Sequence, residues 1–484
     1  MKTKICMLLC LIFVAVFAFA ACGRDNDENG GSDAVAASDD ARAAIHGRVR
    51  FATFEWNNDV NHDEFFERFN QLYPNIEVDR MFVSWDMPQN LTAMAAAGDL
   101  PCIAMDWDHL PFYASQGWLH PLDEFIANDP DIRWVPEFYL NALAFHGQTY
   151  ALPSYFQFNG IMINLDLLDQ LNEDPPPMDW TIDEFMRLAH VGTTTTTSGL
   201  TWAFFHQYMT GQWDRDMGMR GFNVSTQRWD FQNPTWTNAV NTHIDLVNTP
   251  GLLSDHMSPE DHAAKFGEGT DALGAGLVLM AHIAGWNWSW ARHMGFNFDI
   301  WPLPADASIG SRFPTHADFG FMLSTALYPE AAYAVLRHLT ISTDGWLDRI
   351  WMNHNTREYD EAGNFTGIGD PDWLMPTNNS PEVMAAFRAA NEGGVIPTGF
   401  IYQFENIDRY GFVGDWQKWT PNFWDILEPF WGIMYDRILT GEIAASAVAA
   451  ELDELVNASL DRERAEFERI MADVQAEFNA RRGE

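Results

Sequence analysis

Residues 48–107 alternate between strand-like and helix-like patterns along the sequence RVRFATFEWNNDVNHDEFFERFNQLYPNIEVDRMFVSWDMPQNLTAMAAAGDLPCIAMDW. Polar and apolar side chains alternate over residues 48–54, which is typical of a strand. Phe65, Phe66 and Phe69 share one face of a helix, as expected of a helix packed on a sheet. The order strand, helix, strand, helix, strand predicts an α/β fold with a parallel sheet and right-handed crossovers. The predicted strands lie within residues 48–54, 75–83 and 102–107, and the helices within residues 61–74 and 87–101.

The ends of the first and third predicted strands carry aromatic and acidic residues. Trp56 follows the first strand, and Asp106, Trp107 and Asp108 follow the apolar part of the third. Because ligands of parallel α/β sheets bind beyond the carboxyl ends of the strands, we expect these side chains to line a binding crevice.

The first 21 residues have the order of a secretory signal. Two lysines precede an apolar run over residues 5–21 that contains no acidic residue, and this run is shorter than the ~20 apolar residues of a membrane-spanning helix. The sequence FAAC at residues 19–22 resembles the lipobox of bacterial lipoproteins, although Leu is usual where Phe19 stands. We therefore predict that Cys22 is lipidated and holds the chain at the outer face of the cytoplasmic membrane. Secretion with an unmodified cysteine is the alternative.

The segment after Cys22 has the composition of a tether. From Gly23 to about Ala44 the chain consists almost entirely of small, polar and acidic residues, which cannot bury enough apolar surface to fold. We expect residues 22–45 to be a disordered tether that spans on the order of 25 Å and holds a folded body away from the membrane.

Composition excludes several classes of function. The chain has 28 basic and 68 acidic residues and a net charge of −40, so nucleic acid and anionic lipid surfaces are poor partners. After the signal only Lys265 and Lys418 remain, and neither stands in a glycine-rich phosphate-binding loop. ATP hydrolysis by such a loop is therefore excluded.

Three later segments add to the picture. Residues 273–290, LGAGLVLMAHIAGWNWSW, predict a buried strand whose end releases Trp286 and Trp288. Residues 193–200, TTTTTSGL, have low complexity and are predicted to be a mobile surface loop. Residues 443–482 are rich in Ala, Glu and Arg with helical periodicity, which predicts a long helix at the carboxyl terminus.

Several segments from Arg48 to Ala458 resemble, in their order and spacing, the extracellular solute-binding proteins of ABC transporters. The similarity is to the sugar-binding, maltose-binding-protein-like group of that family. The segments that carry it are FNQLYPNIEV, LTAMAAAGDLPCIAMDWD, YASQGWLHPLDEFI, HGQTYALP, NLDLLDQL, PPPMDWTIDEF, KFGEGTDALGAG, WPLP and FWDILEPFWGIMYDRILTGEIAASAVAAEL.

This resemblance implies a type II periplasmic-binding-protein-like fold. Such a protein has two α/β lobes of mainly parallel sheets flanked by helices, with a hinged cleft between the lobes, and each lobe is assembled from separate parts of the chain. The expected divisions are the signal at residues 1–21, the lipidated Cys22 and tether at 22–45, the N-terminal lobe at 46–155 and 306–375, and the C-terminal lobe at 156–305 and 376–484.

The resemblance also implies positions of ligand-binding residues. Asp108 stands where the family has a sugar-bonding Asp, and Gln157 stands where a Glu is found, so a charged contact becomes neutral here. Trp286 and either Trp424 or Trp419 match stacking tryptophans. By their positions in the chain, the residues that complete the predicted site are Tyr155, Asn287, Trp288 and Asp318, together with Trp56, Asp106 and Trp107.

The expected function is capture of a carbohydrate, with an oligosaccharide favoured by the 21 tryptophans, for delivery to an ABC permease. Sugar hydroxyls need carboxylates and amides, and the flat C–H faces of sugars suit aromatic rings. The chain is expected to act as a monomer, without a cofactor or metal and without catalysis. The alternatives are the same fold binding a polyamine or a peptide, and a surface glycoside hydrolase that uses two carboxylates.

Overall fold

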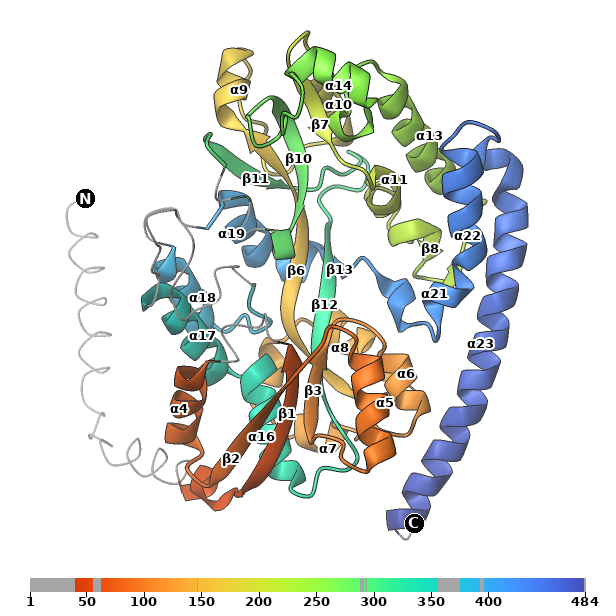
Figure 1. Ribbon diagram of the computed structural model, residues 1–484. Helices are drawn as coiled ribbons and strands as arrows, with labels where there is room; N and C mark the ends of the chain where they lie inside the picture. The colour runs from red at the N-terminus through yellow and green to blue at the C-terminus, as the bar shows by residue number, and fades with distance from the viewer. Residues whose placement is uncertain are drawn as a thin grey trace, which may run out of the picture.

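The computed structural model describes residues 40–54, 62–145, 147–287, 291, 294–355, 375–391 and 396–482. These residues form two lobes, one above the other in Figure 1, joined by long strands. The predicted signal and Cys22 lie outside the described residues, and so do Trp56 and Trp288.

The lower lobe begins with the predicted strands and helices. Strand β1 pairs in parallel with β2 on one side and with β3 on the other, which confirms the parallel sheet. Phe65, Phe66 and Phe69 are the buried residues of α4. Helix α5 begins at Asp86, whose side chain accepts from the backbone N–H of Gln89, and ends at Gly98 in the left-handed conformation that favours glycine. The bounds are β1 Gly47–Phe54, α4 Asp63–Leu72, β2 Ile76–Val83, α5 Met87–Ala97 and β3 Ile103–Asp106.

Two long strands join the lobes. Strands β6 (Ala151–Asn164) and β12 (Phe313–Met322) pair antiparallel, and β12 also pairs antiparallel with β3. The upper half of β6 pairs instead with β10 and β11, so one strand belongs to both lobes (Figure 1). The main sheet has the order β2-β1-β3-β12-β6-β10-β7, with β11 on β6 and β13 on β12. The prediction of mainly parallel sheets therefore holds for the outer strands, while the strands that cross between lobes pair antiparallel.

The upper lobe is built around β7, β10 and β11. Strand β7 (Ser198–Thr201) pairs in parallel with β10, and Ser198 and Leu200 are fully buried. The prediction of a surface loop over residues 193–200 is therefore wrong for its second half, because β-sheet pairing overrides the low-complexity signal. The bounds in this lobe are α9 Leu165–Gln170, α10 Ile182–Val191, α11 Phe205–Tyr208, α12 Thr210–Trp213, η2 Met219–Gly221, β8 Phe222–Asn223, β9 Arg228–Trp229, α13 Pro234–Asn248, η3 Ser254–His256, α14 Pro259–Phe266, β10 Val278–Ala284, η4 Gly285–Asn287 and β11 Phe298–Pro302.

The carboxyl-terminal segment forms a third packed cluster and a long helix. Helices α21 and α22 and the π-helix η6 pack with β8, β9 and α13 against α23 (Ala445–Arg482), which confirms the predicted terminal helix. Figure 1 shows α23 running along the side of both lobes, and its far half contacts α6 of the lower lobe. The bounds are η5 Trp416–Trp419, α21 Phe423–Ile426, α22 Glu428–Ile433 and η6 Met434–Ile438.

The remaining elements lie in the lower lobe, except that α19 packs on β11 of the upper lobe. They are α6 Leu110–Ser115, α7 Asp123–Ile126, η1 Ile132–Trp134, α8 Glu137–Ala142, β4 Ala144–Phe145, β5 Gln148–Thr149, α16 Pro329–Thr340, α17 Thr343–Asn355, α18 Pro381–Ala390, α19 Thr398–Glu405, α20 Ile407–Tyr410 and β13 Gly411–Val413.

The folded body begins before residue 46. Residues 40–44 form a helical turn, in which Arg42 pairs with Asp344 at 2.8 Å and the carbonyl of Ala43 accepts from Asn75 at 2.7 Å. The last residues of the predicted tether are therefore docked on the lower lobe. In the described ranges, none of the helices combines the length and the apolar character that crossing a membrane requires.

Candidate functional site

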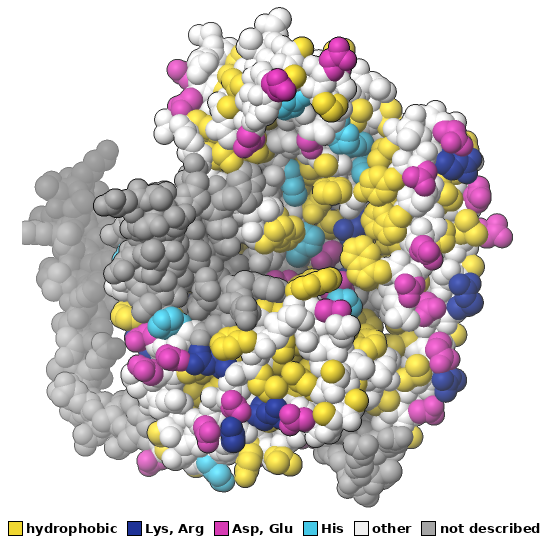
Figure 2. All heavy atoms as spheres, viewed as in Figure 1, with side chains coloured by type: hydrophobic (Ala, Val, Ile, Leu, Met, Phe, Trp, Pro, Cys, Tyr) yellow, Lys and Arg dark blue, Asp and Glu magenta, His cyan; other side chains and the backbone are white. Residues whose placement is uncertain are grey.

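Figure 2 shows a recess between the two lobes in which hydrophobic side chains gather beside histidine and charged side chains. We call it the interlobe recess. Its residues come from the carboxyl end of β3, the junction of β10 and η4, the middle of β12, and the segment from η5 to η6.

The carboxylate of Asp106, at the end of β3, makes its contacts with residues that follow it closely in the chain. Its carboxylate accepts from the Tyr113 hydroxyl at 2.5 Å and from the backbone N–H of Trp107 at 2.8 Å, and it lies 3.3 Å from Nδ1 of His109. Burial opposes protonation of His109, but the bond to Asp106 and the negative charges of Asp106, Asp108 and Asp86 together outweigh burial and raise the His109 pKa. Asp106 therefore shapes the loop that presents Asp108.

Asp108 connects the two lobes. Its Oδ1 accepts from the backbone N–H of His109 at 2.8 Å, and its Oδ2 accepts from the indole N–H of Trp424 at 3.2 Å. His109 has a φ of 67°, which is uncommon for a residue other than glycine and turns the chain at this point. Burial raises the pKa of Asp108. The buried carboxylate of Asp108 and the half-exposed indole of Trp424 thus lie together.

Lys418 holds the floor of the recess together, and the sequence analysis did not assign it. Its Nζ donates to the carbonyl of Trp107 at 2.7 Å and lies 3.1 Å from Asp415. His316 contacts the same Asp415 oxygen through Nδ1 at 2.9 Å. Burial alone would raise the pKa of Asp415, but Lys418 and His316 hold it well below its usual range. Lys418 is one of two lysines after the predicted signal, and the rarity of lysine was the only indication of its role in the sequence.

Asp318 and Gln157 lie on neighbouring strands beside this floor. Burial raises the pKa of Asp318 to about 7, against the opposing effect of Lys418. Gln157 is buried, and among the described residues its Oε1 has no hydrogen-bond partner. A Cβ on Gly285 would come within 2.3 Å of that oxygen, so glycine allows η4 to approach β6 closely.

Trp286 presents an aromatic face to the recess. It is 44% exposed, and its ring stands edge-on to His316 with the centroids 5.0 Å apart. Asn287 is half-buried beside it, and Trp107 packs on Phe54 at 5.1 Å. For Tyr155 only the backbone is described, opposite Asp318 in the β6–β12 pairing.

Two further aromatic rings, Trp431 and Tyr435, continue the row from Trp424 along α22 and η6. Trp424 and Trp431 are nearly parallel at 6.3 Å, and Trp431 and Tyr435 at 5.9 Å. Spacings of seven and four residues place the three rings on one helical face, a signal that was present in the sequence. Trp419 is only 7% exposed and packs on Phe319, whereas Trp424 is 48% exposed, so of these two tryptophans Trp424 has the more exposed ring.

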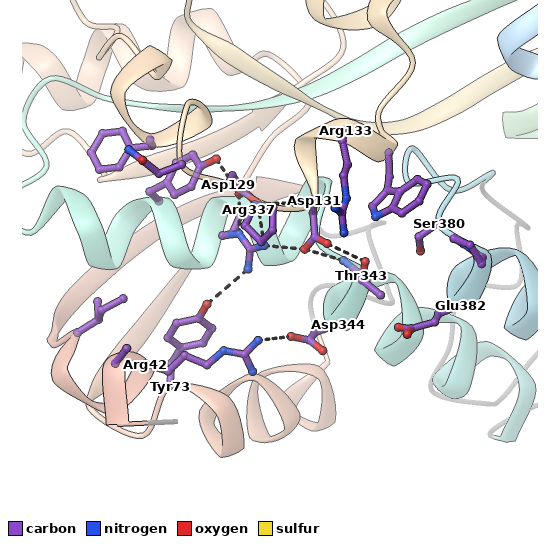
Figure 3. A pocket seen from close by; sticks show the side chains of 18 residues that line it. Arg42, Tyr73, Asp129, Asp131, Arg133, Arg337, Thr343, Asp344, Ser380 and Glu382 are labelled. Carbon is purple, nitrogen blue, oxygen red and sulfur yellow. Dashed lines mark hydrogen bonds and ion pairs between the residues drawn. The ribbon is translucent and has the colours of Figure 1, made fainter. Parts of the chain in front are cut away.

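A second hollow of about 770 Å³ lies in the lower lobe between α16, α17, α18 and η1. Figure 3 shows its charged side chains turned toward one another. Arg337 contacts Asp129 at 2.7 Å and Asp131 at 2.6 Å, and Asp131 also accepts from Thr343 at 2.9 Å. We call these residues the Arg337 network. Because these residues make their hydrogen bonds and ion pairs with one another, we expect the network to stabilise the lower lobe and not to bind a solute.

Metal binding has no support in the described part of the chain, where no group of three or more His, Cys, Asp or Glu side chains could hold an ion.

Comparisons with known proteins bear on the fold of the chain. Residues 62–269 match the family model described as bacterial extracellular solute-binding protein. An ABC substrate-binding protein from Listeria monocytogenes, solved with cycloalternan, is 17% identical and has a TM-score of 0.62 over 86% of this chain and 99% of its own. The cyclic alpha-maltosyl-1,6-maltose binding protein from Arthrobacter globiformis is 15% identical, with a TM-score of 0.62 over 86% and 100%. The maltose/maltodextrin-binding domain MalE from Bdellovibrio bacteriovorus, bound to maltotriose, is 14% identical, with a TM-score of 0.55 over 86% and 100%.

These structural likenesses confirm the predicted two-lobe α/β fold. The family match covers residues 62–269, less than half of the 484-residue chain, so this part of the chain is similar to bacterial extracellular solute-binding proteins, and the solved structures are similar to the chain in fold.

Proposed function

We propose that the chain captures a carbohydrate, most favourably an oligosaccharide, in the interlobe recess and delivers it to an ABC permease. The observation that carries this proposal is the pairing of Trp424 with Asp108, at 3.2 Å from indole N–H to carboxylate. The exposed ring of Trp424 suits the flat C–H surface of a sugar, and the buried carboxylate of Asp108 suits its hydroxyl groups.

A second aromatic face supports the same ligand class. Trp286 stands at the end of β10, and the polar groups of Gln157, Asp318 and His316 lie near it on β6 and β12. A site with a few convergent polar groups among aromatic rings is typical of small-molecule recognition. The structural neighbours named above were solved with cycloalternan or maltotriose or carry a maltose-type sugar in their names, which favours a carbohydrate here.

Delivery requires that binding change the shape of the protein. A solute that contacts both lobes favours the closed state by its extra contacts there, and a permease can then select the loaded form. We propose that the lobes divide at residues 46–155 and 306–375 against 156–305 and 376–484, and that lipidated Cys22 keeps the protein at the outer face of the cytoplasmic membrane.

A polyamine is a weaker candidate for this recess. Asp415 already faces Lys418 and His316, and Asp108 accepts from Trp424. These partners reduce the number of carboxylate oxygens available to a cation, so the geometry favours the neutral hydroxyls of a sugar.

The test is a thermal-shift screen of the full chain against mono- and oligosaccharides, with spermidine and short peptides included. A ligand that binds only the folded state raises the melting temperature by mass action, so we expect a rise with one family of oligosaccharides. A rise only with spermidine or peptides would overturn the carbohydrate proposal and keep the binding function. Release of product from a chromogenic glycoside would contradict a binding role without catalysis.

A further inference from the structure

Arg220 occupies a constrained turn in the upper lobe. Its φ of 56° lies in the left-handed region, which costs free energy for a residue with a side chain and is most often kept at functional positions. Gly221 follows with a φ of 74°, and a Cβ there would come within 3.0 Å of Phe231 and Trp236. Packing therefore fixes the turn, and the turn fixes the direction in which Arg220 leaves the backbone.

The guanidinium of Arg220 lies on the row of aromatic rings. Its central carbon is 5.9 Å from the ring centroids of both Trp424 and Trp431. Its Nε donates to Oε1 of Gln207 at 3.1 Å, and Nε2 of the same Gln207 donates to the Tyr435 hydroxyl at 3.0 Å. The side-chain amide of Gln207 therefore fixes one edge of the guanidinium, and this amide is itself hydrogen-bonded to Tyr435, the last ring of the row.

The other edge of the guanidinium remains available to a ligand. Within the described residues, the two terminal nitrogens of Arg220 make no hydrogen bond and face no carboxylate within 4.0 Å. This is notable in a chain with 68 acidic and 28 basic residues. By contrast, Arg228, only eight positions along the chain, forms a two-pronged pair with Asp461.

We propose that Arg220 is an anion subsite of the interlobe recess, so that the solute is an acidic saccharide with a carboxylate beside the ring that stacks on Trp424. This inference rests on the proposed carbohydrate function and narrows its substrate class. The fork of two N–H groups on a guanidinium matches the two oxygens of a carboxylate. A uronic acid supplies such a group directly on a sugar ring.

The position of Arg220 in the recess explains why this one cation is enough to bind an acidic solute in an acidic protein. The net charge of −40 repels an acidic solute from a distance, but at physiological salt this repulsion is screened beyond about 8 Å. Inside the recess, Asp415 is paired with Lys418 and His316, and Trp424 contacts both Arg220 and Asp108. A solute stacked on Trp424 can therefore place its acidic group at Arg220 and a hydroxyl at Asp108.

The experiment measures the affinity of the full chain by isothermal titration calorimetry for matched sugars. The probes are neutral trisaccharides of glucose, mannose and galactose, and the same trisaccharides with one uronic acid ring or with one 6-O-sulfate. The variants are Arg220→Gln and Arg220→Lys. The matched control is Arg462→Gln, because Arg462 is exposed on α23 and bonds only within its own helix. Thermal unfolding checks that each variant is folded. If Arg220→Gln does not fold, the comparison is made with Arg220→Lys instead.

We expect one uronic acid trisaccharide to bind at least roughly tenfold more tightly than its neutral partner, the scale of one charge-assisted pair. Arg220→Gln removes this preference, Arg220→Lys keeps part of it because it lacks the fork, and Arg462→Gln leaves it unchanged. Equal binding of neutral and acidic partners, or a preference that survives Arg220→Gln, would overturn the inference while the carbohydrate function stands. Preference for the sulfate would overturn the carboxylate assignment. Binding of no trisaccharide of either kind would count against the proposed function itself.

Discussion

The Arg337 network and the interlobe recess are both clusters of charged residues beside a hollow, but their partners differ. In the Arg337 network, Asp129 takes bonds from Arg337 and from the Tyr333 hydroxyl, and Asp131 takes bonds from Arg337 and Thr343. In the recess, among the described residues, Oε1 of Gln157 and Nε2 of His316 are buried without a hydrogen-bond partner.

The aromatic residues differ in the same way. Tyr333 of the Arg337 network is 7% exposed and stacks on Phe125 at 4.9 Å. Trp286 and Trp424 of the recess are 44% and 48% exposed. Buried polar atoms without partners and exposed ring faces are costly for a folded protein unless something else uses them. The difference teaches that the size of a hollow does not by itself identify a solute site, and that exposed aromatic rings beside polar atoms without partners set the recess apart from the Arg337 network.

The largest expected effect is on stability, from Arg337→Met. This variant leaves Asp129, whose side chain is 1% exposed, without its charge partner. We expect the free energy of unfolding to fall by about 3–5 kcal/mol, measured by urea denaturation, with sugar affinity unchanged in the folded protein.

The control for this variant is Arg388→Met on α18, which breaks an exposed pair with Glu405 and is expected to cost at most about 1 kcal/mol. Equal losses from the two variants would contradict the structural role of the Arg337 network. A loss of sugar binding in folded Arg337→Met would place a solute contact in the hollow beside the Arg337 network, outside the interlobe recess, and would contradict our account.

The next effect is on affinity, from Trp424→Ala. This change removes a stacking face and the donor to Asp108, so we expect the Kd of the oligosaccharide identified by the thermal-shift screen to rise roughly tenfold or more. Unfolding is expected to change little, because the ring is half exposed. Trp85→Ala is the matched control, since Trp85 is 68% exposed and lies after β2. Unchanged affinity in Trp424→Ala would remove the observation that carries the proposed function.

The smallest effect is a dependence of stability on pH, from Asp318→Asn. Burial raises the pKa of Asp318 to about 7, whereas the unfolded chain has a value near 3.9. The folded state therefore holds the proton more tightly, and this carboxyl lowers the free energy of unfolding progressively as the pH rises from about 4 to about 7.

Asp318→Asn removes that cost. We expect its gain in melting temperature over the wild type to be a few degrees larger at about pH 8.5 than at about pH 5.5, measured by thermal unfolding. Asp169→Asn, at an exposed position on α9, serves as the control and is expected to show no such difference. A gain of equal size at both pH values would mean that Asp318 is not kept protonated by its surroundings.

The elements that the sequence predicted well are those set by local periodicity. The alternation of residues 48–54 and the buried face of Phe65, Phe66 and Phe69 need no information from elsewhere in the chain, and β1 and α4 formed as expected. The surface loop predicted at 193–200 failed because β7 is stabilised by pairing with β10, about 80 residues later.

The residues of the recess also divide into those that the sequence indicated and those that it did not. Asp108, Trp286 and Trp424 were indicated by strand ends and by the family resemblance. Lys418, Asp415 and His316 come from η5, the turn before it and β12. The contact of His316 with Asp415 joins positions 99 residues apart, and that of Lys418 with the Trp107 carbonyl joins positions 311 residues apart. Arg220 depends on a left-handed turn that no periodicity announces. Contacts between distant segments therefore set the part of the site that sequence patterns could not supply.

The most direct test of our account is a crystal structure of the protein with the oligosaccharide that gives the largest thermal shift. We predict sugar rings stacked on Trp424 and Trp286, with a hydroxyl within hydrogen-bond distance of the Asp108 carboxylate. Sugar bound instead in the hollow beside the Arg337 network, or anywhere that leaves Trp424 and Asp108 without a contact, would contradict it.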